Sequence, residues 1–414
     1  LPLLLAPAAP ARRPAAASLP PAAPAPLLRA PADAWRGTAR LDFDVWPARG
    51  DLTTDRALLD RATAAWAGSA DGVRRTGEPA TPPGPPATTR LLYAGRLDGA
   101  TVVVLYGDGR LARYTEGGGE GRERTLAVAR ADDADVTTAA AVTLSRTATG
   151  SRYLLAPWVD GADTRDLRTP DTPARPVPHP DGLTAALALT GDAPCTRRPV
   201  LQLRSSPVVA EQHAFLLADV GGLLPAHLTY TPPPDGTPAR PPREATGPEA
   251  LAAWARTACV PGTAGPAGAG PGTRAVNTWA FATQALPEGE GSASWVCVRR
   301  DAWDGGGSAA TAVLLPDPRR TAPPPLRTAA LDDTRACSRF DQNVLASAWW
   351  RAKSGKAYLL VAGSRRLVSV SGTGALTIPE TRTASRALAV PGAGAGDVRL
   401  TGLLDTGARI GTLR

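Results

Sequence analysis

The 414-residue chain has no methionine, only two lysines (Lys353 and Lys356) and no GxSxG, GxxxxGK[ST], HExxH or CxxC motif. These absences argue against the common serine hydrolases, nucleotide-binding proteins and zinc proteins, so we predict no cofactor and no metal. No apolar run in the body reaches the roughly 18 residues that a transmembrane helix needs. We therefore expect a soluble body.

The composition is biased toward arginine, alanine, glycine and proline. Nearly all of the 46 basic residues are arginine, a bias typical of proteins from GC-rich bacterial genomes, and the net charge is +8. This charge favours contact with polyanions, but the basic residues are dispersed, so we expect no nucleic-acid ligand. The 42 glycines and 43 prolines follow no collagen period and indicate many loops.

Residues 1–34 begin with an apolar stretch and continue as a segment rich in proline and alanine. We predict the remnant of a targeting segment followed by a stiff linker, with a cleaved signal peptide and a membrane anchor both left open. The expected localisation is extracytoplasmic, either secreted or tethered to the outer face of the cytoplasmic membrane.

Four cysteines are present, and their spacing favours disulfides in an oxidising compartment. Four cysteines allow three connectivities. We favour the sequential pairs, Cys195 with Cys259 and Cys297 with Cys337.

Three similar landmarks occur twice in the same order. The segment ATAAWA at 62–67 is matched by ALAAWA at 250–255, which places Trp66 and Trp254 188 residues apart. The apolar runs at 89–97 and 277–286 follow at the same offset, and GSRYLL at 150–155 is matched by GKAYLL at 355–360. The order predicts a tandem duplication, with a first domain at 35–240 and a second at 241–414.

Short apolar runs joined by turn signals indicate a β-rich fold. Asp98-Gly99 and Asp108-Gly109 separate three such runs and predict two hairpins. Further strands are expected at 140–145, 152–156, 199–204, 226–231, 357–362 and 398–404. We predict an α+β fold, mostly antiparallel, in which each domain packs one helix on a β-meander; a β-propeller is the alternative.

The segment 403–408 resembles the Asp-Thr-Gly-Ala loop of aspartic proteases, in which two such loops share one proton. A second Asp-x-Gly at Asp219 lies 186 residues before Asp405. Only nine residues follow Asp405, however, and Val220 replaces the hydroxyl residue that this family places beside the carboxylate. An ordinary turn is therefore the preferred interpretation.

Other candidate residues are histidines and tryptophans. His213 and His227 flank a predicted hairpin and, with Glu211 and Asp219, form a candidate acid–base site. Trp158, Trp303 and Trp349 are candidate binding residues, because flat aromatic faces bind sugars and proteins.

We expect a non-enzymatic, envelope-associated binding protein, secreted or tethered, whose partner is a protein or an anionic cell-envelope polymer. Contact with the membrane is expected only through an N-terminal anchor. The alternatives are an extracytoplasmic hydrolase that uses Asp219 or Asp405 with His213 or His227, and a propeller-type interaction scaffold.

Overall fold

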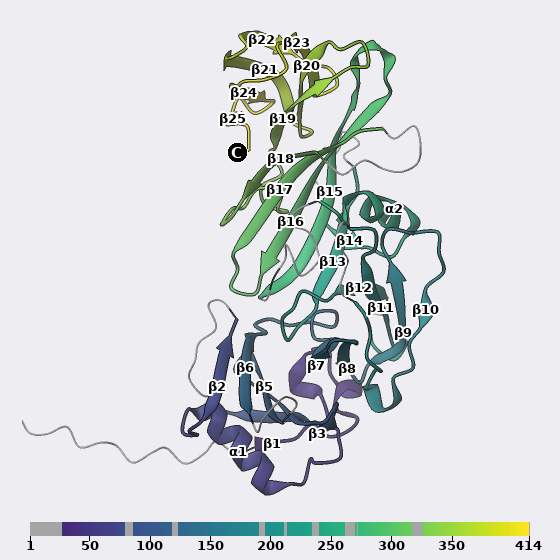
Figure 1. Cartoon of the computed structure of the whole chain (residues 1–414), viewed down its shortest axis with the longest axis vertical. Coiled ribbons are helices and arrows are strands. Elements are labelled where there is room, and N and C mark those ends of the chain that lie inside the picture. The colour runs from purple at the N-terminus through teal and green to yellow at the C-terminus, as the bar shows by residue number, and fades with distance from the viewer. Residues whose placement is uncertain are drawn as a thin grey trace, which may run out of the picture.

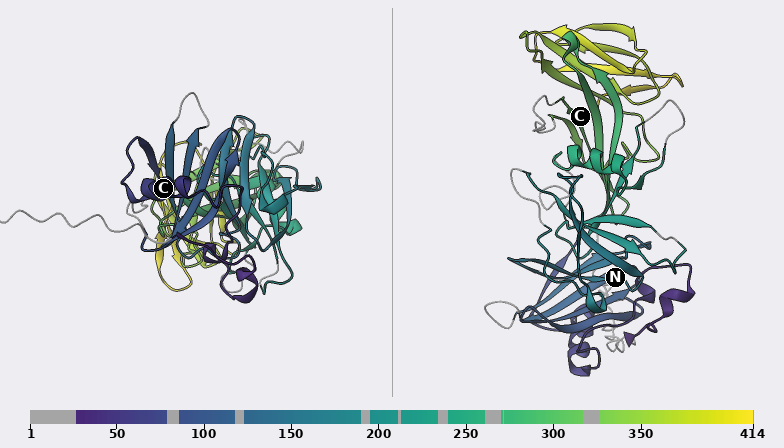
Figure 2. Two further views of the ribbon diagram at one scale, coloured as in Figure 1. Left: turned by 90° about the horizontal axis from the view of Figure 1, so that it is seen from below. Right: turned by 90° about the vertical axis from the view of Figure 1, so that its right-hand side faces the viewer.

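The computed structural model describes residues 27–78, 86–117, 123–189, 195–210, 213–233, 240–260, 270, 272–316 and 326–413. The molecule is elongated, with an N-terminal sheet at one end, the largest sheet in the middle and the C-terminal sheets at the other end (Figure 1). The side view in Figure 2 shows the same elongated shape. The described residues form mostly antiparallel sheets and two α-helices, which confirms the predicted β-rich class.

The N-terminal sheet has six strands in the order β1-β3-β4-β5-β6-β2. They are β1 (Leu27–Leu28), β2 (Val73–Gly77), β3 (Thr89–Leu97), β4 (Ala100–Gly107), β5 (Arg110–Gly117) and β6 (Arg124–Arg130). Asp98-Gly99 and Asp108-Gly109 have positive φ at all four positions, as the two predicted hairpin turns require. Leu27 and Leu28, at the end of the predicted linker, pair with β3.

One face of this sheet is covered by α1 (Arg56–Ala67). The carboxylate of Asp55 caps the helix by accepting a hydrogen bond from the amide of Leu58, and Gly68 ends it at φ 84°. The apolar stripe that includes Leu58 and Trp66 packs on the sheet. The opposite face of the sheet is left for contacts with later strands.

The central sheet has ten strands, in the order β10-β9-β11-β12-β13-β15-β16-β17-β18 with β14 paired to β13. They are β9 (Val159–Asp166), β10 (Arg175–Pro176), β11 (Pro199–Ser205), β12 (Ala214–Ala218), β13 (Ala226–Thr231), β14 (Arg243–Glu244), β15 (Thr273–Ala285), β16 (Ser292–Ala302), β17 (Gly307–Leu314) and β18 (Leu326–Leu331). β13 and β15 pair in parallel, and α2 (Pro248–Thr257) lies between them in the chain. One sheet therefore spans the predicted boundary at 240/241.

The remaining strands form three smaller sheets. One is a hairpin of β7 (Ala141–Thr147) and β8 (Gly150–Leu155). The first C-terminal sheet contains β19 (Leu345–Arg351), β20 (Ala357–Gly363) and β23 (Ala387–Gly392). The second contains β21 (Leu367–Gly374), β22 (Ile378–Arg382), β24 (Val398–Leu404) and β25 (Arg409–Gly411). Four short 3₁₀ helices, η1 (Ala34–Gly37), η2 (Phe43–Val45), η3 (Pro180–Gly182) and η4 (Pro287–Gly289), lie in connections. Within the described residues, no helix is both long and apolar enough to cross a membrane.

A similar order of connections occurs twice. Each half contains a strand, a helix and a second strand parallel to the first: β1, α1 and β3, then β13, α2 and β15. The halves differ in the additional strands, since β2 lies between α1 and β3 whereas β14 lies between β13 and α2. Each half continues with a meander, β3–β6 or β15–β18, and a hairpin, β7–β8 or β19–β20. Four-strand arrangements follow, ordered β10-β9-β11-β12 and β22-β21-β24-β25.

Both predicted disulfides are confirmed. Cys195, before β11, is bonded to Cys259, just after α2, with Cα atoms 5.9 Å apart. Cys297 on β16 is bonded to Cys337 in the loop after β18, with Cα atoms 6.4 Å apart. The first bond thus links the segment before β11 to the end of α2, and the second links β16 to the loop after β18.

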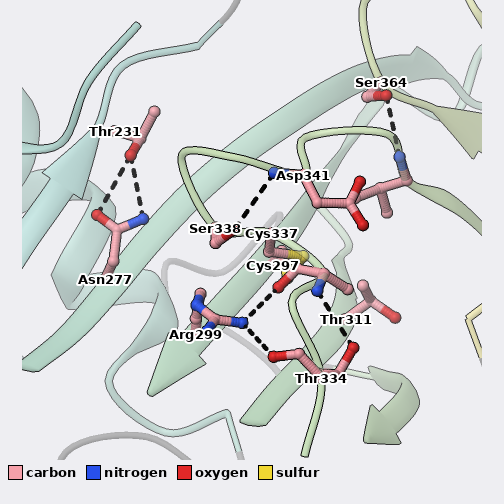
Figure 3. Close-up of a disulfide and its surroundings, with 12 residues drawn as sticks. Thr231, Asn277, Cys297, Arg299, Thr311, Thr334, Cys337, Ser338, Asp341 and Ser364 are labelled. Atoms are coloured by element: carbon pink, nitrogen blue, oxygen red, sulfur yellow. Dashed lines mark hydrogen bonds between the residues drawn. A yellow bond between two sulfur atoms is a disulfide. The ribbon is translucent and has the colours of Figure 1, made fainter. Parts of the chain in front are cut away.

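Arg299 holds the loop beside the second disulfide (Figure 3). Its Nη1 donates to the carbonyl oxygens of Thr334 and Ala336, at 2.7 and 2.9 Å. Its Nε donates to the carboxylate of Asp301 at 2.7 Å. The arginine is only 6% exposed, and these bonds assign it a structural role.

Candidate anion-binding groove

A groove lies over the face of the N-terminal sheet that α1 does not cover. Two rows of cross-strand neighbours form its floor. The first row runs through Val102, Thr115, Thr125 and Arg74, and the second through Arg113, Ala127 and Thr76. Strand β7 and the loop at 221–223 form the other wall. We call the space between them the arginine groove.

The groove consists of two cavities that share Arg113 and Arg146. The larger cavity, of about 330 Å³, lies over the threonine row and is bordered by residues 144–147 of β7. The smaller cavity, of about 180 Å³, is bordered by the end of β2 and by the loop at 221–223. Each cavity is therefore lined by both arginines.

Arg146 is held at the wall of the groove by two partners. Its Nη2 donates to the carboxylate of Asp219 and to the carbonyl oxygen of Gly222, the latter at 2.8 Å. The Arg146 side chain remains 29% exposed, whereas that of Asp219 is 1% exposed. Asp219 thus largely neutralises the charge of Arg146, while the Arg146 side chain still lines both cavities.

Asp219 accepts hydrogen bonds from several buried groups. Its Oδ2 accepts from Ser151 Oγ at 2.8 Å and from the Tyr153 hydroxyl at 2.6 Å, and its Oδ1 accepts from the amide of Gly221 at 2.9 Å. Burial alone would raise the pKa of Asp219, but the charge of Arg146 and these hydrogen bonds hold it below its ordinary value. Burial and the neighbouring Asp219 carboxylate raise the pKa of Tyr153 well above its usual range. Asp219 is therefore an ionised structural anchor.

Arg113 differs from Arg146 because it has no carboxylate partner among the described residues. Its Nη1 donates one hydrogen bond, to the carbonyl oxygen of Thr143 at 3.1 Å. Burial and, to a smaller extent, the nearby charge of Arg146 lower the pKa of Arg113 to about 10. The guanidinium is still charged at neutral pH. It is a partly buried cation that lines both cavities, and no described carboxylate is paired with it.

The other charged groups at the larger cavity are paired. Arg74 forms an ion pair with Glu123, and both side chains are more than half exposed. Asp98 accepts from Arg152 Nε at 2.9 Å and from Ser145 Oγ at 2.6 Å. At the smaller cavity, Glu78 accepts a hydrogen bond from the amide of Leu223 at 3.0 Å. Among the residues that the structure describes, Arg113 and Glu78 are thus the two charged groups that line the groove without an ion-pair partner. Arg113 is the group of the groove that suits an anion.

The structure brings His213 and His227 together, but on Glu244 rather than on Asp219. Glu244 lies 2.8 Å from His227 Nε2 and 3.5 Å from His213 Nε2. Burial would raise the pKa of Glu244, but its hydrogen bonds with the two histidines lower it. The described residues contain no group of three or more His, Cys, Asp or Glu side chains arranged to hold a metal ion. Glu211 lies outside the described residues.

Asp405 and Asp219 have separate partners in different sheets. Asp405 is in the turn between β24 and β25, is exposed, and pairs with Arg366 Nε at 2.7 Å. Asp219 follows β12 and pairs with Arg146. Each carboxylate thus has an arginine partner of its own, and the two share no proton in this arrangement.

The three candidate tryptophans are packed to different extents. Trp158 is fully buried and donates to the carbonyl oxygen of Val136 at 3.0 Å. Trp303 is 6% exposed, and the guanidinium of Arg274 lies 5.3 Å from its ring centroid. Trp349 is partly buried against the C-terminal core and donates to the carbonyl oxygen of Gly396 at 2.9 Å. Trp158 and Trp303 thus belong to the core and leave little ring surface for a ligand.

No family model, curated protein or solved structure matches this chain. The functional assignment therefore depends on the groove itself. Sequence reasoning singled out Asp219 but missed Arg113 and Arg146. The sequence did contain a signal. Arg113 lies two residues after Leu111, and Arg146 lies two residues after Leu144, so each arginine falls on the same inward face of its strand as a core leucine. A charged residue is unusual at such a position.

Proposed function

We propose that this protein is an extracytoplasmic, non-enzymatic binding protein that recognises an anionic ligand in the arginine groove. The observation that carries the proposal is Arg113, a partly buried cation that lines both cavities and has no carboxylate partner among the described residues. Burying an unpaired charge costs free energy, which a bound anion would offset. The partner class that the net charge favours, an anionic cell-envelope polymer, fits this site.

The proposed location rests on the cysteines. Both disulfides join segments far apart in sequence, and such bonds persist in oxidising compartments. We propose that the protein acts outside the cytoplasm, with the proline- and alanine-rich N-terminal segment as a spacer from the membrane. Residues 1–26 of that segment lie outside the described residues. Fractionation of the native host, with thiol titration of the recovered protein, tests the location: two disulfides in an envelope or medium fraction support it, and free thiols in a cytosolic fraction contradict it.

We also propose that the two halves arose by duplication of one α+β unit. The repeated order of connections supports this, as do the equivalent places of Trp66 on α1 and Trp254 on α2, both essentially buried. For such a duplication, the order of the strands supports a boundary between β12 and β13, at 219–225, in place of the predicted 240/241. They favour a duplicated unit over the radial blades of a propeller. Superposition of residues 27–218 on 226–411 in an experimental structure should align the strands in the same order.

Binding of the full-length protein to immobilised polygalacturonate, compared with neutral dextran, tests the proposed function. Arg113→Gln should weaken polygalacturonate binding by about tenfold or more, since charge-assisted hydrogen bonds are worth roughly 1.5–3 kcal/mol. Arg382→Gln is the matched control, because Arg382 is exposed on β22 and its loss changes the net charge equally. Equal weakening by both variants would mean that the overall charge, rather than the groove, binds the polymer.

A further inference from the structure

We infer that the smaller cavity of the arginine groove takes a zwitterionic unit, in which a primary amine and one anionic group are joined by a short apolar chain. This inference rests on the proposed function and adds an amine to the anion that the groove recognises. It depends on two unmatched charges of opposite sign in this cavity, on the way in which Glu78 is held, and on the lining between the two charges.

The smaller cavity contains one unmatched cation and one unmatched carboxylate. Its charged lining residues are Arg113, Arg146 and Glu78. Arg146 is paired with Asp219, whereas no ion pair among the described residues includes Arg113 or Glu78. An anion alone would match Arg113 but would place a second negative charge in the cavity that holds Glu78. A ligand that carries both charges can match both groups.

Backbone amides hold the carboxylate of Glu78 at the wall of the cavity. Its Oε1 accepts from the amide of Leu223 at 3.0 Å, and the amide of Gly272 is a second donor. Burial raises the pKa of Glu78 above its ordinary value, and these hydrogen bonds and the charge of Arg146 limit the rise. A carboxylate offers about four acceptor sites, so Glu78 can accept further hydrogen bonds from an ammonium group.

Arg113 and Glu78 lie on the same face of the N-terminal sheet. Arg113 on β5, Ala127 on β6 and Thr76 on β2 are cross-strand neighbours, and Glu78 lies two residues after Thr76. Two strand spacings and two residues along β2 place the Cα atoms of Arg113 and Glu78 roughly 12 Å apart. Both side chains line one cavity without forming an ion pair with each other. The amine and the anion of a ligand that contacts both must therefore be several bonds apart.

The rest of the lining suits a short apolar chain between the two charges. Apart from the three charged residues and Thr76, the lining residues are glycine or apolar: Gly77, Ala127, Val128, Gly221, Gly222 and Leu223. The cavity, at about 180 Å³, is smaller than the roughly 300–1,000 Å³ typical of pockets for drug-sized ligands. Because Arg113 and Arg146 line both cavities, the remainder of a longer ligand can extend past them into the larger one.

The test is calorimetric titration of the full-length protein at pH 7 with two sets of matched probes. In the first set, 4-aminobutanoate is a zwitterion, N-acetyl-4-aminobutanoate carries the anion alone, and 4-aminobutanamide carries the amine alone. In the second, glycerophosphoethanolamine is a zwitterion and glycerophosphoglycerol carries the anion alone, so the two sets distinguish a carboxylate from a phosphodiester. At least one zwitterion should bind about tenfold more tightly than the other probes of its set, since a charge-assisted hydrogen bond is worth roughly that factor.

Glu78→Gln tests recognition of the amine within one variant. It should weaken the preferred zwitterion by about tenfold and leave the matched anion unchanged or more tightly bound, because it removes a charge that attracts the amine and repels the anion. Glutamine can still accept from the amide of Leu223. Asp60→Asn is the control, because Asp60 is exposed on α1, which covers the opposite face of the sheet, and its loss changes the net charge equally. Loss of folding would weaken both probes, so it cannot imitate the expected change in preference.

The outcomes separate the two proposals. Arg113→Gln should weaken the zwitterion and the matched anion alike, since both use the charge of Arg113. If each zwitterion binds no more tightly than its matched anion, or if Glu78→Gln affects both equally, while Arg113→Gln still weakens binding, the groove binds anions but the inferred amine is wrong. If neither zwitterions nor anions bind, or if binding does not respond to Arg113→Gln, the proposed function fails together with this inference.

Discussion

Arg146 and Asp219 form an ion pair across the wall of the groove, with Asp219 fully enclosed and Arg146 partly open to the cavities. This pair explains why two neighbouring arginines have different roles. Arg146 is held in place and largely neutralised by Asp219. Its positive charge still contributes to lowering the pKa of Arg113. The carboxylate that the sequence offered as a catalytic candidate thus holds an arginine of the proposed binding site.

The first prediction concerns Asp219. Asp219→Ala should destabilise the protein by about 3–5 kcal/mol, because it leaves Arg146 without its buried partner and removes the acceptor of two buried hydroxyls. Asp405→Ala should cost less than about 1 kcal/mol, since the pair with Arg366 is exposed. Urea unfolding measures both. Similar costs for the two substitutions would contradict the difference in burial.

The second prediction concerns pH. The pKa of Glu244 is lower in the folded protein than its ordinary value, so Glu244 binds its proton less readily when folded than when unfolded. Its contribution to stability should be complete above the unfolded pKa of about 4.3 and be lost as the pH falls through the folded pKa. Urea unfolding between pH 7 and pH 3 should therefore give a shallower acid decline for Glu244→Gln than for the wild type. An identical slope would show that Glu244 does not contribute to this decline.

The third prediction separates binding from stability at Arg113. Arg113→Met should leave the free energy of unfolding unchanged or raise it by up to about 2 kcal/mol, because it removes a buried charge that lacks a counter-ion. The same variant should lose anion binding. Urea unfolding and calorimetric titration measure the two effects, and a marked loss of stability would indicate that Arg113 has a structural role.

The fourth prediction concerns the disulfides. Replacing Cys297 and Cys337 together by serine should cost about 2–4 kcal/mol, since the bond closes a segment with a sequence separation of 40 residues. The double replacement of Cys195 and Cys259 should cost a similar amount, because the separation there is 64 residues. Urea unfolding of both variants under oxidising conditions provides the measurement. Wild-type stability in either variant would show that the bond is dispensable.

Much of the fold was predictable because its signals are local. Asp-Gly pairs specify hairpin turns through their tolerance of positive φ, and the predicted strand at 199–204 is observed as β11. The spacing around Trp66 and Trp254 likewise predicted both α-helices. The continuation of the central sheet across residue 240 was less predictable, because the parallel pairing of β13 with β15 is a long-range contact with no signature in the sequence around it.

The sequence by itself determined the β-rich class, the two helices and, by the simplest pairing, both disulfides, since each follows from residues close together in the chain or from a small number of alternatives. Only the tertiary structure decided which charged groups meet. It placed Arg113 beside Arg146, Asp219 behind Arg146, and two histidines on Glu244. Those encounters depend on the packing of separate strands, and packing determines which charges are neutralised and which remain available to a ligand.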